Sequence, residues 1–376
     1  MAACDVVVAG HICLDIIPQF PPGQLPGFIK PGSLHEIDPV VLSTGGTVSN
    51  AGRNLHRLGI ETRLMGKVGR DPFGEIVLDL IRADDPALAE DMIIMPGETT
   101  SYTVVISPPG ADRSFLHCPG ANHTVGPRDV DYTRVHGARL FHFGYPPLMR
   151  RMYSDDGAEL AEIFRRVQAG GVITSLDMAM PDLHGPSGQV NWRRVLENTL
   201  PHVDLFLPSL DELLFMLHPG APEPTSDAVV SEIAAEVLAL GAHVSVIKLG
   251  SRGLYLRTGA GGLPGSPDPG WRNRELWIPC FVPKVLAGTT GSGDATIAGF
   301  IAALLRGQTA EEALIAAVAV GACNVEAPDA LSGVCSWDMT QARVRSGWAH
   351  AALTIQCPGW TWDARYQLWR GPADQG

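Results

Sequence analysis

The feature that most restricts the fold of this sequence is an alternation of short, apolar, β-rich runs with longer helical stretches. The predicted strands are residues 5–10, 63–68, 139–143, 172–177, 205–207 and 244–248, and the later ones alternate with predicted helices at residues 157–169, 192–200 and 227–240. Strands separated by helices of this length form a mostly parallel sheet with helices on both faces. Ligands of such a sheet bind at the carboxyl ends of its strands. We therefore predict an α/β fold whose site receives residues 5–10, 141–145 and 175–177.

Composition limits the class of protein. The 376 residues, 45% of them hydrophobic and 18% charged, are enough for one large α/β domain with an appendage. The net charge of −12, with no run of more than two Lys or Arg, argues against a nucleic-acid partner. Seven scattered cysteines without a C-x-x-C pair fit a reducing compartment. Without a signal-peptide pattern or a bilayer-length apolar run, we expect a cytoplasmic protein that does not contact a membrane.

A glycine-rich turn precedes the most apolar helical stretch, at residues 288–301, which read GTTGSGDATIAGFI. Gly291 and Gly293 let the backbone bend tightly, and the free N–H groups at the start of a helix bind anions. Asp294 would repel a bound phosphate, but it could take a proton from a hydroxyl that attacks one. An Asp in a first helical turn is also an ordinary capping residue. The combination of an anion site and a base suggests a kinase.

A second glycine turn lies at residues 43–59, where Gly45 and Gly46 precede a helical pattern that contains Asn50 and ends at Gly59. Taken alone, an Asn in a first turn is often a local cap. The β-rich runs at residues 99–107 and 113–118 predict a hairpin with a five-residue turn. Residues 18–39 are rich in Pro and Gly and give only a weak indication of strands.

Together, the two glycine turns resemble the two signatures of the ribokinase-like (PfkB) carbohydrate kinases, which read G-G-x-x-x-N-x-A-x-x-L-x-R-L-G and D-T-x-G-A-G-D-x-F. The second signature matches at Thr289, Thr290, Gly291, Gly293, Asp294 and Ala295, and departs at Gly288, Ser292 and Thr296. The resemblance covers about residues 4–335. It implies a three-layer α/β/α fold with a core at residues 1–11, 43–96 and 123–335, a discontinuous β lid at residues 12–42 and 97–122, and an extension at residues 336–376.

The resemblance also implies roles for particular residues in the ATP-dependent phosphorylation of a sugar or polyol. Asp294 would be the general base, and the amides of Gly291, Ser292 and Gly293 would form the anion hole. The family's substrate residues correspond to Asp15, Gly45, Gly46 and Asn50, and Tyr145 would either line the sugar pocket or pack in the core. The family's nucleotide side corresponds to Lys248, Gly250, Gly253, Thr290 and Gly321.

Metal requirements follow from the same resemblance. Glu212 would organise Mg²⁺ and its waters near ATP, although it could equally be an exposed Glu at a helix start. Many relatives bind K⁺ through the Asp that is replaced here by Gly288, so we expect no strong K⁺ requirement. Thr47 stands where ribokinases usually have Lys, which makes ribose a less expected acceptor.

Alternatives remain open at this stage. The acceptor could be a nucleoside, or the chain could be a sugar- or nucleotide-binding regulator without catalytic activity. The last forty residues carry five of the eight Trp, beginning at Trp337. Because so many large aromatic side chains rarely stay in water, we expect this extension to pack onto the body or across a dimer, and a homodimer is possible.

Overall fold

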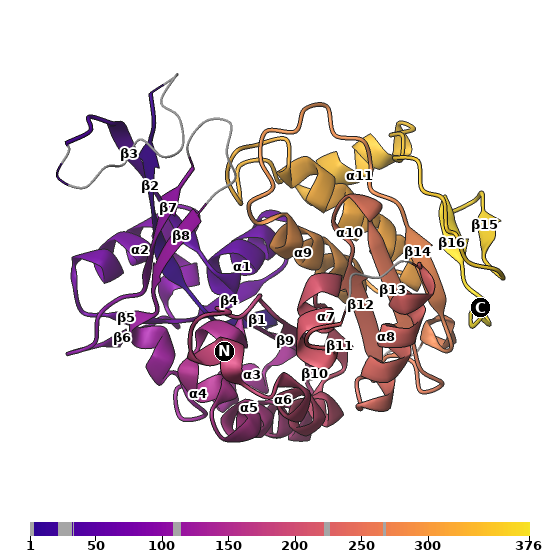
Figure 1. Ribbon diagram of the computed structural model, residues 1–376, viewed down its shortest axis with the longest axis horizontal. Coiled ribbons are helices and arrows are strands. Elements are labelled where there is room, and N and C mark those ends of the chain that lie inside the picture. The colour runs from indigo at the N-terminus through magenta and orange to yellow at the C-terminus, as the bar shows by residue number, and fades with distance from the viewer. Residues whose placement is uncertain (1–3, 22–31, 33, 108–113, 222–225, 266–267) are drawn as a thin grey trace.

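A computed structural model describes residues 4–21, 32, 34–107, 114–221, 226–265 and 268–376. The part of the chain it describes contains a ten-stranded sheet in the order β15-β16-β14-β13-β12-β11-β10-β9-β1-β4 (Figure 1). Six neighbouring strands are parallel to one another: β12 (Val244–Lys248), β11 (Leu205–Phe206), β10 (Ile173–Asp177), β9 (Ala138–Gly144), β1 (Cys4–Gly10) and β4 (Thr62–Met65). The other four pair antiparallel: β13 (Leu254–Thr258), β14 (Glu275–Ile278), β16 (Leu368–Arg370) and β15 (Thr361–Asp363). The predicted mostly parallel α/β sheet is confirmed.

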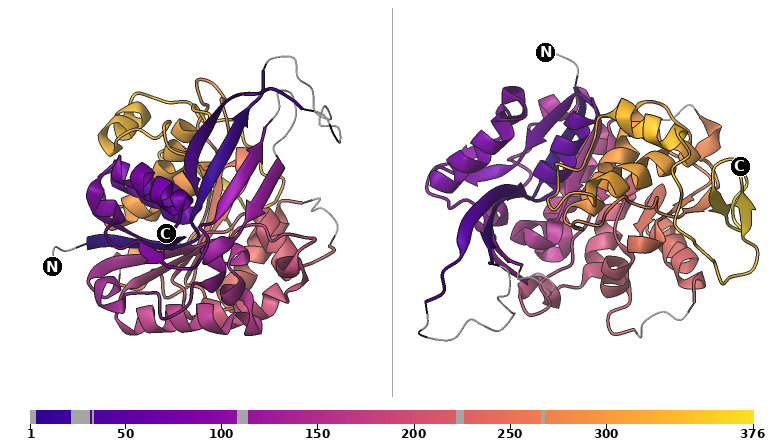
Figure 2. Two further views of the ribbon diagram at one scale, coloured as in Figure 1. Left: turned by 90° about the vertical axis from the view of Figure 1, so that its left-hand side faces the viewer. Right: turned by 90° about the horizontal axis from the view of Figure 1, so that it is seen from above.

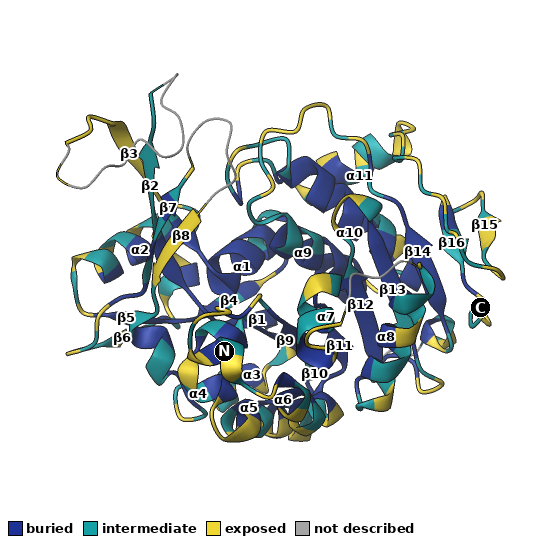
Figure 3. Cartoon of the chain, viewed as in Figure 1, coloured by how far each residue is buried: buried dark blue, intermediate teal, exposed yellow. Residues whose placement is uncertain are grey.

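Alternate side chains of the sheet bury against helices on its two faces. Along β1, Val6 and Val8 pack with α1 (Thr47–Arg57), α9 (Ser292–Leu305) and α10 (Ala310–Asn324). Val7 and Ala9 pack on the other face with α5 (Ala158–Ala169), α6 (Trp192–Thr199), α7 (Leu210–Leu217) and α8 (Ala228–Ala239). This alternation follows from the two-residue period of a strand, and it produces three layers (Figures 2 and 3). The remaining α-helices are α2 (Pro72–Arg82), α3 (Tyr132–Val135), α4 (Arg150–Tyr153) and α11 (Trp337–Arg345).

Short 3₁₀ helices connect the larger elements. They are η1 (Pro86–Ala89), η2 (Gly120–Thr124), η3 (Pro146–Leu148), η4 (Asp155–Gly157), η5 (Pro186–Gln189), η6 (Leu200–His202), η7 (Gly250–Arg252) and η8 (Pro269–Trp271). Within the described residues, every helix is too short or too polar to traverse a lipid bilayer.

The segment expected to form one strand at residues 63–68 forms two. β4 ends at Met65, and β5 (Lys67–Gly69) pairs instead with β6 (Ile93–Met95). Gly66 separates the two strands, and a Cβ at that position would lie 2.9 Å from Ile12 Cγ2. The chain therefore leaves the central sheet at a residue that must be small.

A separate four-stranded sheet projects from one side of the body, in the order β3-β2-β7-β8 (Figures 1 and 2). Its strands are β2 (Cys13–Gln19), β3 (Asp38–Gly45), β7 (Tyr102–Ile106) and β8 (Ser114–Cys118). β7 and β8 pair antiparallel, as the hairpin prediction requires, while the turn at residues 108–112 lies outside the described residues. The assignment of residues 12–42 and 97–122 to a lid stays a prediction.

The C-terminal extension packs against the body of the same chain. β16 pairs with β14, placing Trp369 opposite Trp277, so the extension adds two strands to the central sheet. Trp360 lies against Trp277, with ring centroids 5.9 Å apart. Of the two packing arrangements considered for this Trp-rich segment, the structure shows the one within the chain.

Candidate active site

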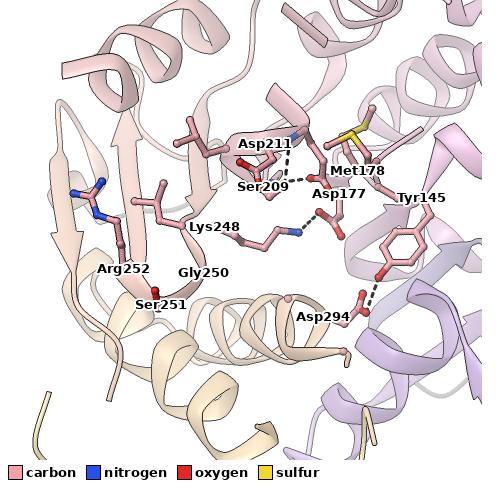
Figure 4. Close-up of a pocket in the computed structure, with 17 residues that line it drawn as sticks. Tyr145, Asp177, Met178, Ser209, Asp211, Lys248, Gly250, Ser251, Arg252 and Asp294 are labelled. Atoms are coloured by element: carbon pink, nitrogen blue, oxygen red, sulfur yellow. Dashed lines mark hydrogen bonds and ion pairs between the residues drawn. The ribbon is translucent and has the colours of Figure 1, made fainter. Parts of the chain in front are cut away.

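The site lies at the carboxyl edge of the parallel strands, where several polar side chains meet. Asp177 is the last residue of β10, Lys248 is the last of β12, and Tyr145 directly follows β9. Together with the first turn of α9, they line a cavity of about 650 Å³ (Figure 4). The sheet topology thus brings together residues that are far apart in the sequence, as the edge rule for parallel sheets predicts.

Asp294 is buried at the inner end of this cavity, in the first turn of α9, with a 2% exposed surface. Its Oδ2 accepts hydrogen bonds from Tyr145 Oη (2.7 Å) and Asn50 Nδ2 (3.1 Å). Among the described residues, its other oxygen, Oδ1, is buried without a hydrogen-bond partner. Burial raises the pKa of Asp294, while the hydrogen bonds from Tyr145 and Asn50 and the charge of Lys248 oppose the increase. A buried carboxylate with one oxygen fixed and the other unpartnered is suited to accept a proton.

Tyr145 reaches Asp294 from an unusual backbone conformation. Its φ of 65° and ψ of 40° are left-handed, which L-residues adopt at a cost of about 1–2 kcal/mol. Its amide donates to the carbonyl of Asp177 (3.3 Å), which holds this turn against the neighbouring strand. Of the two roles considered for Tyr145, the structure places its hydroxyl in the site.

The glycine turn before α9 has the conformation that the sequence indicates. Gly291, with φ 70°, precedes the helix, and a Cβ there would collide with Ala330. The amide of Ser292 donates to the carbonyl of Thr289 (3.2 Å), so it is already engaged. The amides of Gly293 and Asp294 belong to the first turn, where a helix offers no internal acceptor. They are the N–H groups best placed for an anion.

Lys248 supplies the positive charge beside this turn. A Cβ at Gly293 would lie 3.7 Å from Lys248 Nζ, and this Nζ donates to Asp177 Oδ1 at 2.6 Å (Figure 4). Burial lowers the pKa of Lys248, but the carboxylates of Asp177 and Glu212 outweigh this effect and raise it. Lys248 therefore stays protonated next to the place where an anion would lie.

Negative charge gathers on the opposite side of Lys248. Burial raises the pKa of Asp177; Lys248 opposes the increase, and the nearby charges of Glu212 and Asp294 add to it. Glu212 lines the same cavity, and its Oε2 accepts the amide of Ser209 (2.6 Å) in a capping box that begins α7. No group of three or more His, Cys, Asp or Glu gathers as a metal site in the described part of the chain. Two crowded carboxylates do fit Mg²⁺, which keeps most of its waters and takes few protein ligands.

On the side of Asp294 that faces the four-stranded sheet, the residues predicted to bind the substrate lie next to two histidines. A Cβ at Gly46 would lie 2.5 Å from His11 Nδ1, and His11 Nε2 is 3.4 Å from His117 Nε2 on β8. Asn50 Oδ1 is buried without a partner among the described residues. Burial lowers the pKa of His11 well below its usual range, and the charge of His117 lowers it further. This neutral, polar wall is suited to hydroxyl groups rather than to an anion.

Asp15 lies farther out, on β2. A Cβ at Gly45 would lie 2.8 Å from Asp15 Oδ1, so the carboxylate rests directly against the diglycine turn. Burial raises the pKa of Asp15 to about 6, although hydrogen bonds from Cys13 and Thr103 oppose the increase. The structure thus brings Asp15 and Gly45 together, as the resemblance implies.

Most of the residues predicted to bind the nucleotide line one or both of two adjoining cavities. A second cavity, of about 480 Å³, adjoins the first, and its mostly apolar wall includes Gly253, Phe281 and Gly321. Lys248 and Gly250 line both cavities. At Gly321 a Cβ would collide with Thr296 Oγ1, so the residue also allows α9 and α10 to pack closely. Among the described residues that line the cavities, Thr289 is present and Thr290 is not.

Sequence reasoning missed three polar residues of the site. Asp177 was expected at this edge of the sheet, but without a role. His117 had no signal of its own, because its contact with His11 depends on how the small sheet packs against the rest of the chain. His11 directly follows the first strand, and a polar residue at that place is the signal that could have identified it.

Comparison with known proteins identifies the family. A family model described as pfkB family carbohydrate kinase matches residues 5–336. The chain therefore belongs to this family, as its two glycine turns indicate, and it is a phosphotransferase with an alcohol group of a sugar as acceptor.

Individual relatives agree with this assignment at low identity. The chain is 25% identical over 258 residues to an uncharacterized sugar kinase from Archaeoglobus fulgidus, covering 69% of this chain and 88% of that protein. It is 24% identical over 309 residues to 2-dehydro-3-deoxygluconokinase from Bacillus subtilis, covering 81% and 87%. The fold resembles that of Arabidopsis thaliana ribokinase complexed with ribose and ATP, with a TM-score of 0.71, 21% identity, and coverage of 90% and 98%. The predicted ribokinase-like fold is confirmed.

Proposed function

We propose that this chain transfers the γ-phosphoryl group of ATP to a primary hydroxyl of a sugar or sugar-like polyol, with Asp294 as the general base. The observation that carries the proposal is the asymmetry of the Asp294 carboxylate. Oδ2 is held by Tyr145 and Asn50, and Oδ1 is buried without a partner among the described residues. A hydroxyl hydrogen-bonded to Oδ1 would lose its proton there as its oxygen attacks phosphorus.

The proposed transfer forms one bond to phosphorus and breaks another. The acceptor oxygen forms a bond to the γ-phosphorus, the bond between that phosphorus and the leaving ADP oxygen breaks, and the acceptor proton passes to Asp294. The amides of Gly293 and Asp294, with the dipole of α9, would stabilise charge on the transferring group. Lys248 would add a full positive charge on the ADP side. Loss of such a contribution typically lowers the rate by about 10²–10³.

The proposal includes Mg²⁺, which Asp177 and Glu212 would hold. Both carboxylates line the first cavity, where burial raises the pKa of Asp177 and the nearby charge of Glu212 adds to the increase. When bound, Mg²⁺ would neutralise part of the phosphate charge. The second cavity would take the adenine ring, since its wall is largely apolar and Gly321 adds no side chain to it.

The four-stranded sheet is proposed to act as a lid over the acceptor. Support comes from Asp15 on β2 and His117 on β8, because both strands carry these polar residues to the acceptor side of Asp294. Several apolar side chains of this sheet are exposed, among them Val41 (48%) and Leu116 (60%). A homodimer that covers them stays a prediction, and light scattering of the purified protein would test it. A cytoplasmic location is part of the proposal, supported by the seven free cysteines.

The test is ATP consumption across a panel of sugars, polyols and nucleosides, followed by analysis of Asp294→Asn with the best acceptor. We expect the variant to lose at least about 10²-fold in kcat while still binding ATP. Asp79→Asn, on the exposed side of α2, is the control for the loss of one surface carboxylate. Turnover near the wild-type value in Asp294→Asn would remove Asp294 as the base. ATP binding without turnover for any acceptor would favour a regulator instead.

A further inference from the structure

We propose that residues 343–351 of the C-terminal extension form a working part of the nucleotide pocket and set the affinity for ATP. This proposal rests on the function proposed above. The family match ends at residue 336, so the extension lies outside the part of the chain that the family shares. It nevertheless reaches the second cavity, because Ala351 is one of the residues that line it.

The extension holds the wall of this cavity by backbone pairing. The amide of Val282 donates to the carbonyl of Ala349 (2.9 Å), and the amide of Ala351 donates to the carbonyl of Cys280 (2.8 Å). Phe281 and His350 stand opposite each other as an antiparallel bridge. Cys280, Phe281 and Val282 all line the cavity. Three consecutive residues of the wall are therefore fixed by the extension.

Side chains reinforce this pairing. The Phe281 ring stacks on His350, with centroids 3.9 Å apart, and on Trp348, with centroids 4.6 Å apart. Trp348 Nε1 also donates to the carbonyl of Val282 at 2.6 Å. Phe281 is 3% exposed, so nearly all of its surface is in contact. Among the described residues that line the cavity, Phe281 is the one aromatic, and it keeps its position through two rings of the extension.

A second connection runs from α11 to the mouth of the same cavity. Arg343 forms an ion pair with Glu326 (2.6 Å) and lies over the Trp348 ring, 3.4 Å from its centroid. Glu326 accepts the amide of Lys284 (2.5 Å). The next residues carry exposed apolar side chains, Val285 (56%) and Leu286 (66%), and Leu286 lines the cavity. This segment between β14 and α9 forms no strand or helix. The extension supports Lys284 indirectly through Glu326. The carbonyl of Val325, in contrast, holds the later residues Ala287 and Gly288.

Loss of this support should affect ATP more than the acceptor. The acceptor side of Asp294 is built by residues before position 146, whereas the contacts above all fall on the wall of the nucleotide cavity. A looser wall would raise the KM for ATP and the Kd for ATP together. The kcat and the acceptor KM would change little, because Asp294 and its partners are untouched.

The experiment compares three variants of the full chain: Trp348→Ala, Trp348→Phe and Trp362→Ala. An aromatic stack is worth enough to change an equilibrium by roughly 2- to 10-fold. We therefore expect Trp348→Ala to raise the KM and calorimetric Kd for ATP by roughly that factor. Trp348→Phe keeps a stacking ring and should recover much of the loss. Trp362, in the same extension, lies against Trp369 and is the matched control, with an unchanged ATP affinity.

The outcomes separate the two proposals. Equal ATP affinities in wild type and Trp348→Ala would overturn the role of the extension, whatever the acceptor. A parallel fall in kcat and in affinity for both substrates would overturn it too, because it would indicate general destabilisation. If Trp348→Ala does not fold, an unaltered ATP affinity in a folded His350→Ala, which removes the other stacking ring, would have the same meaning. Failure to phosphorylate any acceptor would refute the kinase proposal. Calorimetry with ATP would still decide whether the extension sets the affinity for ATP.

Discussion

Replacement of Tyr145 by Phe should raise the pKa of Asp294, the proposed general base. The Tyr145 hydroxyl donates to Asp294 Oδ2 at 2.7 Å, and this hydrogen bond lowers the pKa of Asp294 against the larger effect of burial. A hydrogen bond to a charged group contributes about 1.5–3 kcal/mol. Since one pKa unit corresponds to about 1.4 kcal/mol, its loss should raise the pKa by about 1–2 units.

The sign of the pH effect follows from the proposed role of Asp294 as a base. Below its pKa the carboxyl is protonated and cannot accept the proton of the acceptor hydroxyl. A higher pKa therefore moves the acidic limb of the kcat profile to higher pH, by the same 1–2 units or so. Well above this limb, Tyr145→Phe should retain much of the wild-type kcat. The measurement is kcat at saturating ATP and acceptor from about pH 5 to 9.

Tyr255→Phe is a matched control. Tyr255 Oη also donates to a carboxylate at 2.7 Å, that of Glu275, but both residues lie in the antiparallel part of the sheet. Its removal should leave the acidic limb in place, even if it lowers the melting temperature. If the limb of Tyr145→Phe stays at the wild-type pH or moves to lower pH, the titrating group is not Asp294 under the control of Tyr145. Asp177, whose pKa is also raised by burial, would then be the group to test.

Two further predictions concern the glycine turn. Gly291→Ala should lose more stability than Gly307→Ala, because both positions have left-handed φ angles (70° and 73°) but only at Gly291 would a Cβ meet other atoms; thermal melts of both variants measure the difference, and equal losses would show that Ala330 yields easily. K⁺ should raise kcat little over choline at equal ionic strength, because Gly288 offers no carboxylate, and a large K⁺ activation would show that another ligand set replaces it.

The sequence predicted the strongly patterned parts of this protein well. Alternating strand and helix periods gave the parallel sheet and its functional edge, and the two glycine turns predicted that Asn50 and Asp294 share a site across 244 positions. The added strands β15 and β16 were not predicted. Each spans three residues, and they are defined by pairing with a distant strand rather than by a local pattern.

The sequence around Glu212 contains a helix-start signal that was not used in predicting its role. Ser209 lies three residues before Glu212. Ser followed three residues later by Glu is the signature of a capping box, and both halves of that box are formed at the start of α7. The hydrogen bond from Ser209 fixes one carboxylate oxygen of Glu212. Glu212 can therefore cap α7 and also take the proposed role near Mg²⁺, because the capping hydrogen bond holds its carboxylate in one orientation at the cavity wall.

The conformation of Tyr145, in contrast, could not be predicted from the local sequence. Its left-handed backbone depends on the end of β9, the start of η3 and the pairing with Asp177, and no local pattern encodes this combination. The same holds for the contact of His11 with His117, which joins two sheets. Both cases depend on tertiary packing at the site, where local rules are most often overridden.

The arrangement of the chain suggests that binding and chemistry can be perturbed separately. The first turn of α9 lies between two regions of different origin: the small sheet on the acceptor side and the C-terminal extension on the nucleotide side. A substitution in the extension should then act on the KM for ATP, one at His117 on the acceptor KM, and one at Tyr145 on kcat and its pH profile. Energetic coupling between distant residues without shared partners is usually small, about 0.3–0.5 kcal/mol. Double variants that combine Trp348→Ala with His117→Ala should therefore show nearly additive effects, and strong non-additivity would mean that the small sheet and the extension are energetically coupled.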